Sequence, residues 1–323
     1  MKAILIDAPG ASEVMRYGDA PDPIPAEGEL LIRVAAAGVN RADLLQRAGA
    51  YPPPKDASPI LGLEIAGEVV QGAGDFQRGD RVMGVVTGGG YADYAVIPSG
   101  MALRIPKPIA TVDAAALPEA FLTAYLNMIT LGGLRSGERI LIHAGASGVG
   151  TAAIQVARIV GATILATAGS PEKCDLCRSL GAEITVNYKR ESFLEAAQAV
   201  GGVDMILDFI GSPYWADNLA ALRSGGRVLL IGFLGGSSGT LDLAPILTKS
   251  LTVRGTTLRR TPLSEKIALT RAFEAFAATH WARGELRPII DSVFPLSEAS
   301  AAHRRMMQHA NLGKILLRTE QAE

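Results

Sequence analysis

The chain has 323 residues, of which 48% are hydrophobic and 20% are charged, and its formal net charge is −1 at pH 7. This length predicts about two domains, and the near balance of charge supplies no field that would attract nucleic acid or a membrane surface. The N-terminal apolar stretch is too short for a signal peptide, and no uninterrupted apolar run of about 18 residues follows it. We therefore expect a soluble, cytoplasmic protein without a nucleic-acid or membrane partner.

The first part of the chain, to about residue 121, contains short β-like runs separated by Gly, Pro and Asp. These runs occupy residues 2–6, 29–39, 67–74, 81–86 and 91–98. Such a pattern favours an irregular, mostly antiparallel barrel. A helix is expected over residues 117–133, where two glycines end an apolar run.

From residue 139 onward, short apolar strands alternate with helices. Strands are expected at 139–144, 163–169, 184–188, 204–211, 227–236 and 251–257. Helices are expected at 150–161, 170–181, 191–201 and 212–226, then at 262–284 and 298–311 before a last strand at 313–318. This alternation predicts a doubly wound parallel sheet covered on both faces, so the fold class is α/β.

A glycine-rich turn joins the strand at 139–144 to the next helix. Residues 145–150 match the pattern G-x-G-x-x-G except that Ser147 replaces the second glycine. A turn in this position presents free N–H groups and a partial positive charge to a pyrophosphate. Ser147 limits the closest approach of the backbone, but its hydroxyl can donate to a phosphate oxygen. We predict a dinucleotide site here; the alternative is a helix start without a ligand.

The end of the following strand indicates which dinucleotide is bound. An NAD site usually has Asp or Glu there, in contact with the ribose 2′-OH. This strand instead ends at Gly169 and Ser170, and Lys173 lies in the first turn of the helix after Glu172. A hydroxyl and an ammonium group suit the charge of a 2′-phosphate, so we predict NADPH in preference to NADH. The alternative is that Lys173 is an ordinary solvated residue.

Five segments together resemble the zinc-independent quinone oxidoreductases, which include zeta-crystallin and belong to the medium-chain dehydrogenase/reductase superfamily. These segments are residues 38–54, 61–69, 118–125, 143–155 and 311–317, and the similarity extends from residue 1 to about residue 318. The serine-bearing turn and residues 187–189 and 213–215 resemble the tumour-suppressor-inducible quinone oxidoreductase branch. In that branch a serine stands at this position, which implies that Ser147 leaves the turn functional.

The resemblance implies two domains and an assembly. A GroES-like, partly open β-barrel domain is expected over residues 1–121, completed by residues 258–323. A Rossmann domain that binds NADPH is expected over residues 122–257. Relatives commonly pair through the last Rossmann strand, so a homodimer formed through residues 251–257 is expected.

Zinc enzymes of the same superfamily provide a contrast. They carry a G-H-E-x-x-G segment whose histidine binds catalytic zinc, and a cysteine ligand upstream. This sequence has Leu63 at the histidine position and Asn40 near the cysteine position, and it has no four-cysteine lobe. Without a Lewis acid an alcohol oxidation lacks its usual stabilisation of the alkoxide. We therefore predict a protein that uses no metal.

The resemblance also assigns site residues. The catalytic cleft would be lined by Asn40, Tyr51, Thr123 and Tyr125. Tyr51 would orient a quinone or donate to its oxygen, or else only stiffen the loop before three prolines. The cofactor would contact Gly145, Ser147, Gly148, Val149, Gly150, Gly169, Ser170, Lys173, Tyr188, Asp208, Ile210, Gly211, Gly232, Phe233, Leu234, Thr256, Thr257, Asn311 and Lys314. The segment 311–314 is equally consistent with a simple turn, and no side chain is singled out as a general acid.

Two other groups of residues have simpler interpretations. Cys174 and Cys177 lie inside an expected helix, with no second cysteine pair and no nearby histidine, so we expect inert thiols rather than a redox or zinc site. His143 lies on an apolar strand and is expected to be a hydrogen-bonded core residue.

The sequence as a whole predicts NADPH-dependent reduction of a small-molecule quinone by direct hydride transfer. A zinc-free reductase of α,β-unsaturated carbonyls or enoyl thioesters would use the same hydride geometry. A structural or RNA-binding protein that binds NADPH with little turnover is the alternative from another class. The relative turnover of quinones and enones separates the two reductases. NADPH binding without turnover would indicate the binding protein.

Overall fold

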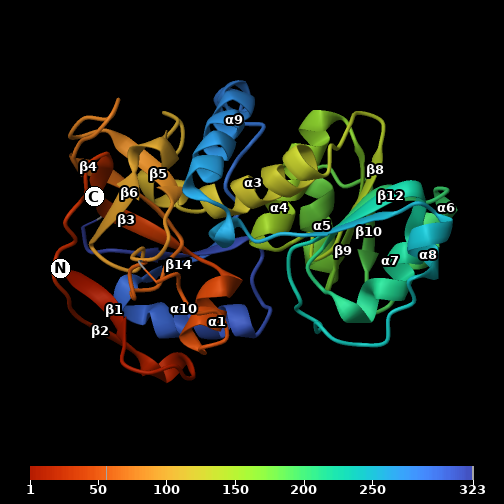
Figure 1. The fold of residues 1–323 in the computed structure, drawn as a ribbon, viewed down its shortest axis with the longest axis horizontal. Coiled ribbons are helices and arrows are strands. Elements are labelled where there is room, and N and C mark those ends of the chain that lie inside the picture. The colour runs from red at the N-terminus through yellow and green to blue at the C-terminus, as the bar shows by residue number, and fades with distance from the viewer. Residues whose placement is uncertain (56, 322–323) are drawn as a thin grey trace. The chain divides into compact units, whose positions relative to one another are not determined.

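The computed structural model describes residues 1–55 and 57–321 of the chain (Figure 1). Its residues form two compact units. The first unit consists of Met1–Glu119 and Pro262–Glu323, and the second unit consists of Ala120–Thr261. Residues 56, 322 and 323 fall within the first domain expected from the sequence but lie outside the described residues.

The first unit is built on a seven-stranded sheet with the order β14-β15-β3-β4-β5-β7, and β6 also pairs with β3. These strands are β3 (Glu29–Val39), β4 (Glu64–Gln71), β5 (Arg81–Val85), β6 (Tyr94–Pro98), β7 (Ala102–Arg104), β14 (Ile290–Pro295) and β15 (Lys314–Arg318). All pairs are antiparallel except β14–β15. Burial along β3 alternates over its first half, as expected for a strand with one face on the core. The prediction of a mostly antiparallel barrel is confirmed.

Shorter elements complete the first unit. A two-stranded sheet pairs β1 (Lys2–Ile6) with β2 (Met15–Asp19). The helices are α1 (Arg41–Arg47), α2 (Thr111–Ala114), α9 (Leu263–Ala282) and α10 (Ala299–Met307). Neither α1 nor β14 was expected from the sequence. The amphipathic signal of α1 is weak over seven residues. Its start is marked by a capping box between Asn40 and Asp43, in which the Asn40 N–H donates to the Asp43 carboxylate at 2.8 Å.

A helical stretch, Thr111–Leu131, connects the two units along the chain. It contains α3 (Pro118–Tyr125) and the π-helix η3 (Leu126–Leu131). By length and composition alone this stretch is apolar enough to cross a membrane, but 67% of the relevant window is buried inside the structure. Core helices of soluble proteins have the same composition.

The second unit contains six parallel strands in the order β10-β9-β8-β11-β12-β13. These strands are β8 (Arg139–Ile142), β9 (Thr163–Ala168), β10 (Ile184–Asn187), β11 (Val203–Asp208), β12 (Leu222–Leu230) and β13 (Thr252–Gly255). The helices are α4 (Gly148–Val160), α5 (Pro171–Leu180), α6 (Phe193–Ala199), α7 (Trp215–Ala221) and α8 (Ala244–Thr248). The strand order reverses between β8 and β11, where doubly wound sheets bind ligands. The predicted doubly wound parallel sheet is confirmed.

The expected boundary between α7 and β12 is wrong. A helix was expected over 212–226 and a strand over 227–236, but α7 ends at Ala221, β12 begins at Leu222, and the strand ends at Leu230. Leu222 already pairs with Val203, and the pairing resumes at Arg227 after an irregularity that contains Gly225 at φ +76°. Pairing with β11 therefore outweighs the local helical preference, and residues 231–243 form a loop beyond β12.

Candidate functional site

The glycine-rich turn is packed closely between β8 and β9. A Cβ added to Gly145 would lie 2.9 Å from Cys177 Sγ and 3.0 Å from Ala166 Cβ. A Cβ added to Gly150 would lie 2.3 Å from the Ala144 carbonyl oxygen. Ala144 itself has φ +48°, a left-handed conformation that a non-glycine residue adopts at some energetic cost. The turn therefore requires glycine at both positions.

Ser147 caps the N-terminus of α4. Its Oγ accepts a hydrogen bond from the Gly150 N–H at 3.0 Å, so the hydroxyl hydrogen is not used in this bond and can donate to a ligand. Gly148 and Val149 open the helix and are half-buried, which leaves their backbone accessible. The helix has 13 residues, and its first turn favours a bound anion. The geometry fits a phosphate group at this turn.

A buried polar network lies under the turn. His143 is fully buried; its Nε2 donates to Asn218 Oδ1 at 2.8 Å, and the Thr167 hydroxyl lies 3.1 Å from its Nδ1. Burial lowers the pKa of His143 to about 4, so the ring is neutral at pH 7. The prediction of a hydrogen-bonded core histidine is confirmed.

Asp208 ends β11 and turns its carboxylate toward the protein. Oδ1 accepts from the Ile210 N–H at 2.6 Å and the Gly211 N–H at 3.2 Å, while Oδ2 accepts from Asn218 Nδ2 at 3.1 Å. The side chain is 1% exposed, and burial raises its pKa to about 6. The Asp208 oxygens thus shape the 208–211 turn, in which Gly211 has φ +89°. The expected contact of Asp208 with the cofactor stays a prediction.

The residues expected at the 2′-phosphate lie at the start of α5. Ser170 is the N-cap residue, and its Oγ accepts from the Lys173 N–H at 3.3 Å. Lys173 is half-buried in the first turn, and exposed Tyr188 lies over Gly169, whose added Cβ would be 2.7 Å from the Tyr188 hydroxyl oxygen. The pKa of Glu172 is lowered by its own N–H and by the Ser170 hydroxyl, which places an acid at the same cap.

The ends of β12 and β13 carry the remaining cofactor residues. Gly232 approaches β11, with its added Cβ 3.2 Å from the Phe209 carbonyl oxygen, and Phe233 and Leu234 are 58% and 43% exposed. Thr256 follows β13, and its N–H donates to the Leu230 carbonyl at 3.1 Å. The neighbouring Thr257 is exposed. These residues therefore lie at the carboxyl edge of the sheet, the same edge as the α4 turn.

The candidate catalytic residues lie in both units. Asn40 and Tyr51 are half-buried in the first unit, and Thr123 and Tyr125 are half-buried on α3. Burial raises the pKa of the Tyr125 hydroxyl.

Asn40 belongs to a buried charged cluster. Its Nδ2 donates to Glu64 Oε1 at 2.8 Å, and its Oδ1 accepts from Lys314 Nζ at 2.8 Å. Lys314 also donates to Glu64 Oε1 and to the Val39 carbonyl, and Glu64 Oε2 accepts from the Glu119 N–H at 2.9 Å. The three N–H groups of Lys314 thus all have acceptors within this unit, and its expected contact with the cofactor stays a prediction. The Asn311 amide donates to the Gly313 carbonyl, as in the turn interpretation of this segment.

These residues do not fit a zinc site. Among residues 1–55 and 57–321, no group of three or more His, Cys, Asp or Glu side chains is placed to bind a metal ion. Leu63 has no donor atom, and the Glu64 carboxylate is already neutralised by the Lys314 ammonium. Leu63 and the Glu64–Lys314 ion pair therefore form a buried cluster with balanced charges and not a site for a cation.

Cys174 and Cys177 lie in α5, where both are buried and neither forms a disulfide. Burial raises the pKa of Cys177 to about 12 and also raises the pKa of Cys174. Thiols that remain protonated at pH 7 are poor nucleophiles and poor metal ligands, which agrees with the expectation of an inert pair.

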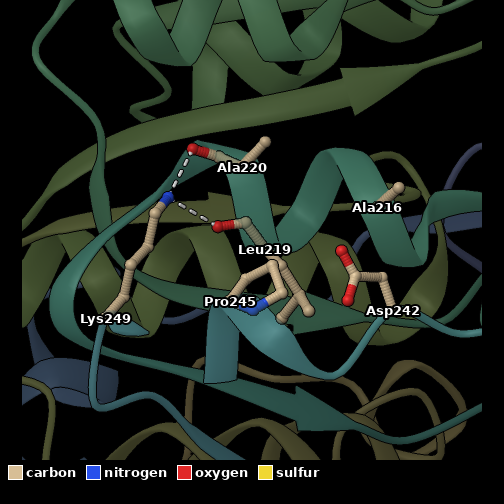
Figure 2. Close-up of a pocket in the computed structure, with 6 residues that line it drawn as sticks. All are labelled: Ala216, Leu219, Ala220, Asp242, Pro245 and Lys249. Atoms are coloured by element: carbon tan, nitrogen blue, oxygen red, sulfur yellow. Dashed lines mark hydrogen bonds between the residues drawn. The ribbon is translucent and has the colours of Figure 1, made fainter. Parts of the chain in front are cut away.

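A surface hollow lies between α7 and α8, as Figure 2 shows; it is lined by Ala216, Leu219, Ala220, Asp242, Pro245 and Lys249. Lys249 Nζ donates to the carbonyls of Leu219 and Ala220 at 2.8 and 3.0 Å (Figure 2). It also donates to the Leu222 carbonyl at 2.9 Å. The ammonium group thereby closes the C-terminal end of α7, where carbonyls lack helical partners. No predicted site residue lines this hollow, and we assign it a structural role.

One residue of the candidate site was missed from the sequence. Asn127 lies in η3, and its side chain joins the Thr123 carbonyl to the Thr256 hydroxyl. An asparagine in an apolar helix was a visible signal, but its partner lies 129 residues away in the sequence.

Comparison with known proteins identifies relatives over the whole chain. Two family models match: alcohol dehydrogenase GroES-like domain over residues 26–107 and zinc-binding dehydrogenase over residues 148–274. The quinone oxidoreductase of Sus scrofa is 32% identical over 333 residues, which cover 98% of this chain and 97% of the relative. The quinone oxidoreductase of Homo sapiens is 31% identical with the same coverage.

Solved structures give the same result. A quinone oxidoreductase from Thermus thermophilus, studied alone and with NADPH, has a TM-score of 0.84 and 35% identity, covering 98% of this chain and 100% of that one. Escherichia coli quinone oxidoreductase complexed with NADPH has a TM-score of 0.88 and 28% identity, with coverages of 98% and 100%. The resemblance deduced from the sequence is confirmed at the level of the family.

Proposed function

Because this chain belongs to the quinone oxidoreductase family of the medium-chain dehydrogenase/reductase superfamily, we propose that it reduces quinones with NADPH by direct hydride transfer without a metal ion. The observation that carries this proposal is the serine-capped turn at the start of α4, at the carboxyl edge of a parallel sheet. The NADPH complexes of similar proteins support the choice of cofactor. The tumour-suppressor-inducible branch remains our proposed placement within the family.

NADPH, when bound, supplies the hydride, and the protein's part is to bind and orient the two reactants. Ser147 and the N–H groups of Gly148 and Val149 would bind the pyrophosphate. Ser170 and Lys173 would hold the 2′-phosphate, with Tyr188 beside the adenosine. The loop at 232–234 and Thr256 and Thr257 would contact the nicotinamide end.

The quinone would be held by Asn40, Tyr51, Thr123 and Tyr125. A quinone is a strong hydride acceptor, and its developing oxyanion takes a proton from water or from a nearby hydroxyl, so a Lewis acid is not required. The pairing of Glu64 with Lys314 supports a metal-free site, because it places a fixed cation beside Asn40. The proposed domain roles are catalytic for residues 1–121 with 258–323, and cofactor binding for residues 122–257.

We extend the proposal to assembly and location. Strand β13 is an edge strand whose residues Thr252, Arg254 and Gly255 are exposed, and Leu243 and Leu247 before it are 61% and 84% exposed. Exposed edges of this kind favour pairing with a second chain. A homodimer formed through β13, in the cytoplasm, fits these features, and light scattering on the purified protein tests it.

The function is tested by a screen of NADPH oxidation with ortho- and para-quinones, enones and aldehydes. We expect turnover that is fastest with quinones and unchanged by chelators. Faster turnover of enones than of quinones would favour the alternative function, a reductase of α,β-unsaturated carbonyls or enoyl thioesters. Saturable NADPH binding without turnover on any acceptor would favour a binding protein, and a rate abolished by chelation would reject the metal-free mechanism.

A further inference from the structure

We propose that Asn127 is a positioning residue that fixes the Thr256 hydroxyl as a hydrogen-bond acceptor for the carboxamide N–H of the bound cofactor. This inference rests on the proposed function, because it assumes a nicotinamide ring at the carboxyl edge of the parallel sheet. It concerns specificity for the carboxamide group rather than the transfer of hydride.

The geometry around Asn127 is well defined. Its side chain is 1% exposed and lies in η3, which continues α3. Nδ2 donates to the Thr123 carbonyl at 2.9 Å, and Oδ1 accepts from the Thr256 hydroxyl at 2.7 Å. A π-helical turn within a helix is uncommon and is frequently found at functional sites. Here it carries a buried amide that connects a candidate catalytic residue with a candidate cofactor residue.

The partners of Asn127 determine the direction of both hydrogen bonds. The Thr123 carbonyl oxygen can only accept, so the NH2 group of Asn127 must face it and Oδ1 must face Thr256. Thr256 has one hydroxyl hydrogen, and that hydrogen is used in the bond to Asn127. The Thr256 Oγ1 therefore offers only lone pairs to a further partner.

Thr256 is placed where a cofactor would use such an acceptor. It follows the last residue of β13, and its N–H donates to the last residue of β12, Leu230. Its side chain is half-buried, so a ligand can reach it. Ligands of doubly wound sheets lie beyond these strand ends. A lone-pair acceptor suits the amide N–H of a carboxamide and disfavours a carboxylate, whose oxygens can only accept.

The test compares the dissociation constants of NADP⁺ and of its nicotinic acid analogue, in which a carboxylate replaces the carboxamide. We expect the wild-type protein to prefer NADP⁺ by more than about tenfold, since a matched hydrogen bond is replaced by a repulsive contact. In Asn127→Leu the Thr256 hydroxyl is released and can donate to the carboxylate. The analogue should then bind about three- to tenfold more tightly, which a merely structural role would not produce.

Three further variants keep the inference testable if Asn127→Leu folds poorly. Thr256→Val removes the acceptor and should reduce the preference for NADP⁺, whereas Thr256→Ser should retain it. Thr248→Val, which removes a threonine hydroxyl from α8, should leave the preference unchanged. An unchanged preference in Thr256→Val, or no gain for the analogue in folded Asn127→Leu, overturns the inference.

Binding of adenosine 2′,5′-bisphosphate separates this inference from the proposed function, because that ligand has no nicotinamide ring. All variants should bind it as the wild-type protein does. Failure of the wild-type protein to bind it, or to bind NADP⁺, contradicts the proposed function. A different result is that the wild-type protein binds both ligands normally while the preference for NADP⁺ over its nicotinic acid analogue is unchanged in Asn127→Leu and Thr256→Val. That result contradicts only the inference.

Discussion

Lys314 and Glu64 form an ion pair in which both side chains are almost fully buried, with exposed fractions of 5% and 0%. The two residues lie 250 positions apart in the sequence, on β15 and β4. Their charges compensate one another beside Asn40, a residue of the proposed catalytic cleft, whose Oδ1 accepts from Lys314 Nζ at 2.8 Å. This pair is therefore the structural basis for the proposed metal-free site.

Removal of one partner should destabilise the fold strongly. Lys314→Met leaves the Glu64 carboxylate buried without a counter-charge, and we expect a loss of about 3–5 kcal/mol in the free energy of unfolding. The double variant Lys314→Met/Glu64→Gln should recover much of this loss. Urea unfolding measures both. A single variant within about 1 kcal/mol of the wild-type protein would contradict the assigned role.

Ser147→Ala should weaken cofactor binding specifically. It removes a helix cap and a phosphate donor, so we expect a loss of about 1 kcal/mol in stability together with a several-fold rise in the KM for NADPH. Ser192→Ala is the matched control, because Ser192 caps α6 by accepting from the Glu195 N–H at 3.2 Å. That variant should lose similar stability and keep its KM. Equal KM values in the two variants would remove Ser147 from the cofactor site.

Charge at the start of α5 should determine the choice of cofactor. Lys173→Glu should raise the KM for NADPH far more than the KM for NADH, because it places a carboxylate beside the 2′-phosphate. Glu172→Gln should have the opposite effect and lower the KM for NADPH, since it removes an acid held by Ser170. Lys107→Glu, on an exposed residue of the first unit, is the control. Equal effects of Lys173→Glu on both cofactors would contradict the assignment.

His143 should make stability depend on pH. Its folded pKa of about 4 lies below the unfolded value near 6.5, so the unfolded chain binds more protons between these values. The stabilisation is complete above about pH 6.5 and is lost as the pH falls toward 4, by up to about 3 kcal/mol. In His143→Gln this contribution is absent, so the stability advantage of the wild-type protein should shrink over that interval. An advantage that is constant with pH would show that His143 is not buried as a neutral ring.

The sequence was sufficient where the determining interactions are local. The turn at 145–150 and the alternating strands from residue 139 depend on glycine spacing and on apolar periodicity, and both were predicted. The end of α7 was misplaced because Leu222 pairs with Val203 on a neighbouring strand. The buried His303 side chain contacts Arg47 and Tyr91, which lie 256 and 212 positions away from it in the sequence. No local pattern indicates these contacts. The hydrogen-bond partners of Asp208 and Lys314 were not predicted for the same reason, since these partners come together only in the folded chain.

The most direct measurement of the central claim is quinone-dependent oxidation of NADPH carrying deuterium at the transferred position, after exhaustive treatment with a chelator. The account predicts quinone-dependent turnover that chelation leaves unchanged and that deuterium slows by a primary isotope effect. Retained NADPH binding with no oxidation by any quinone, or activity that is lost on chelation and restored by zinc, would contradict it.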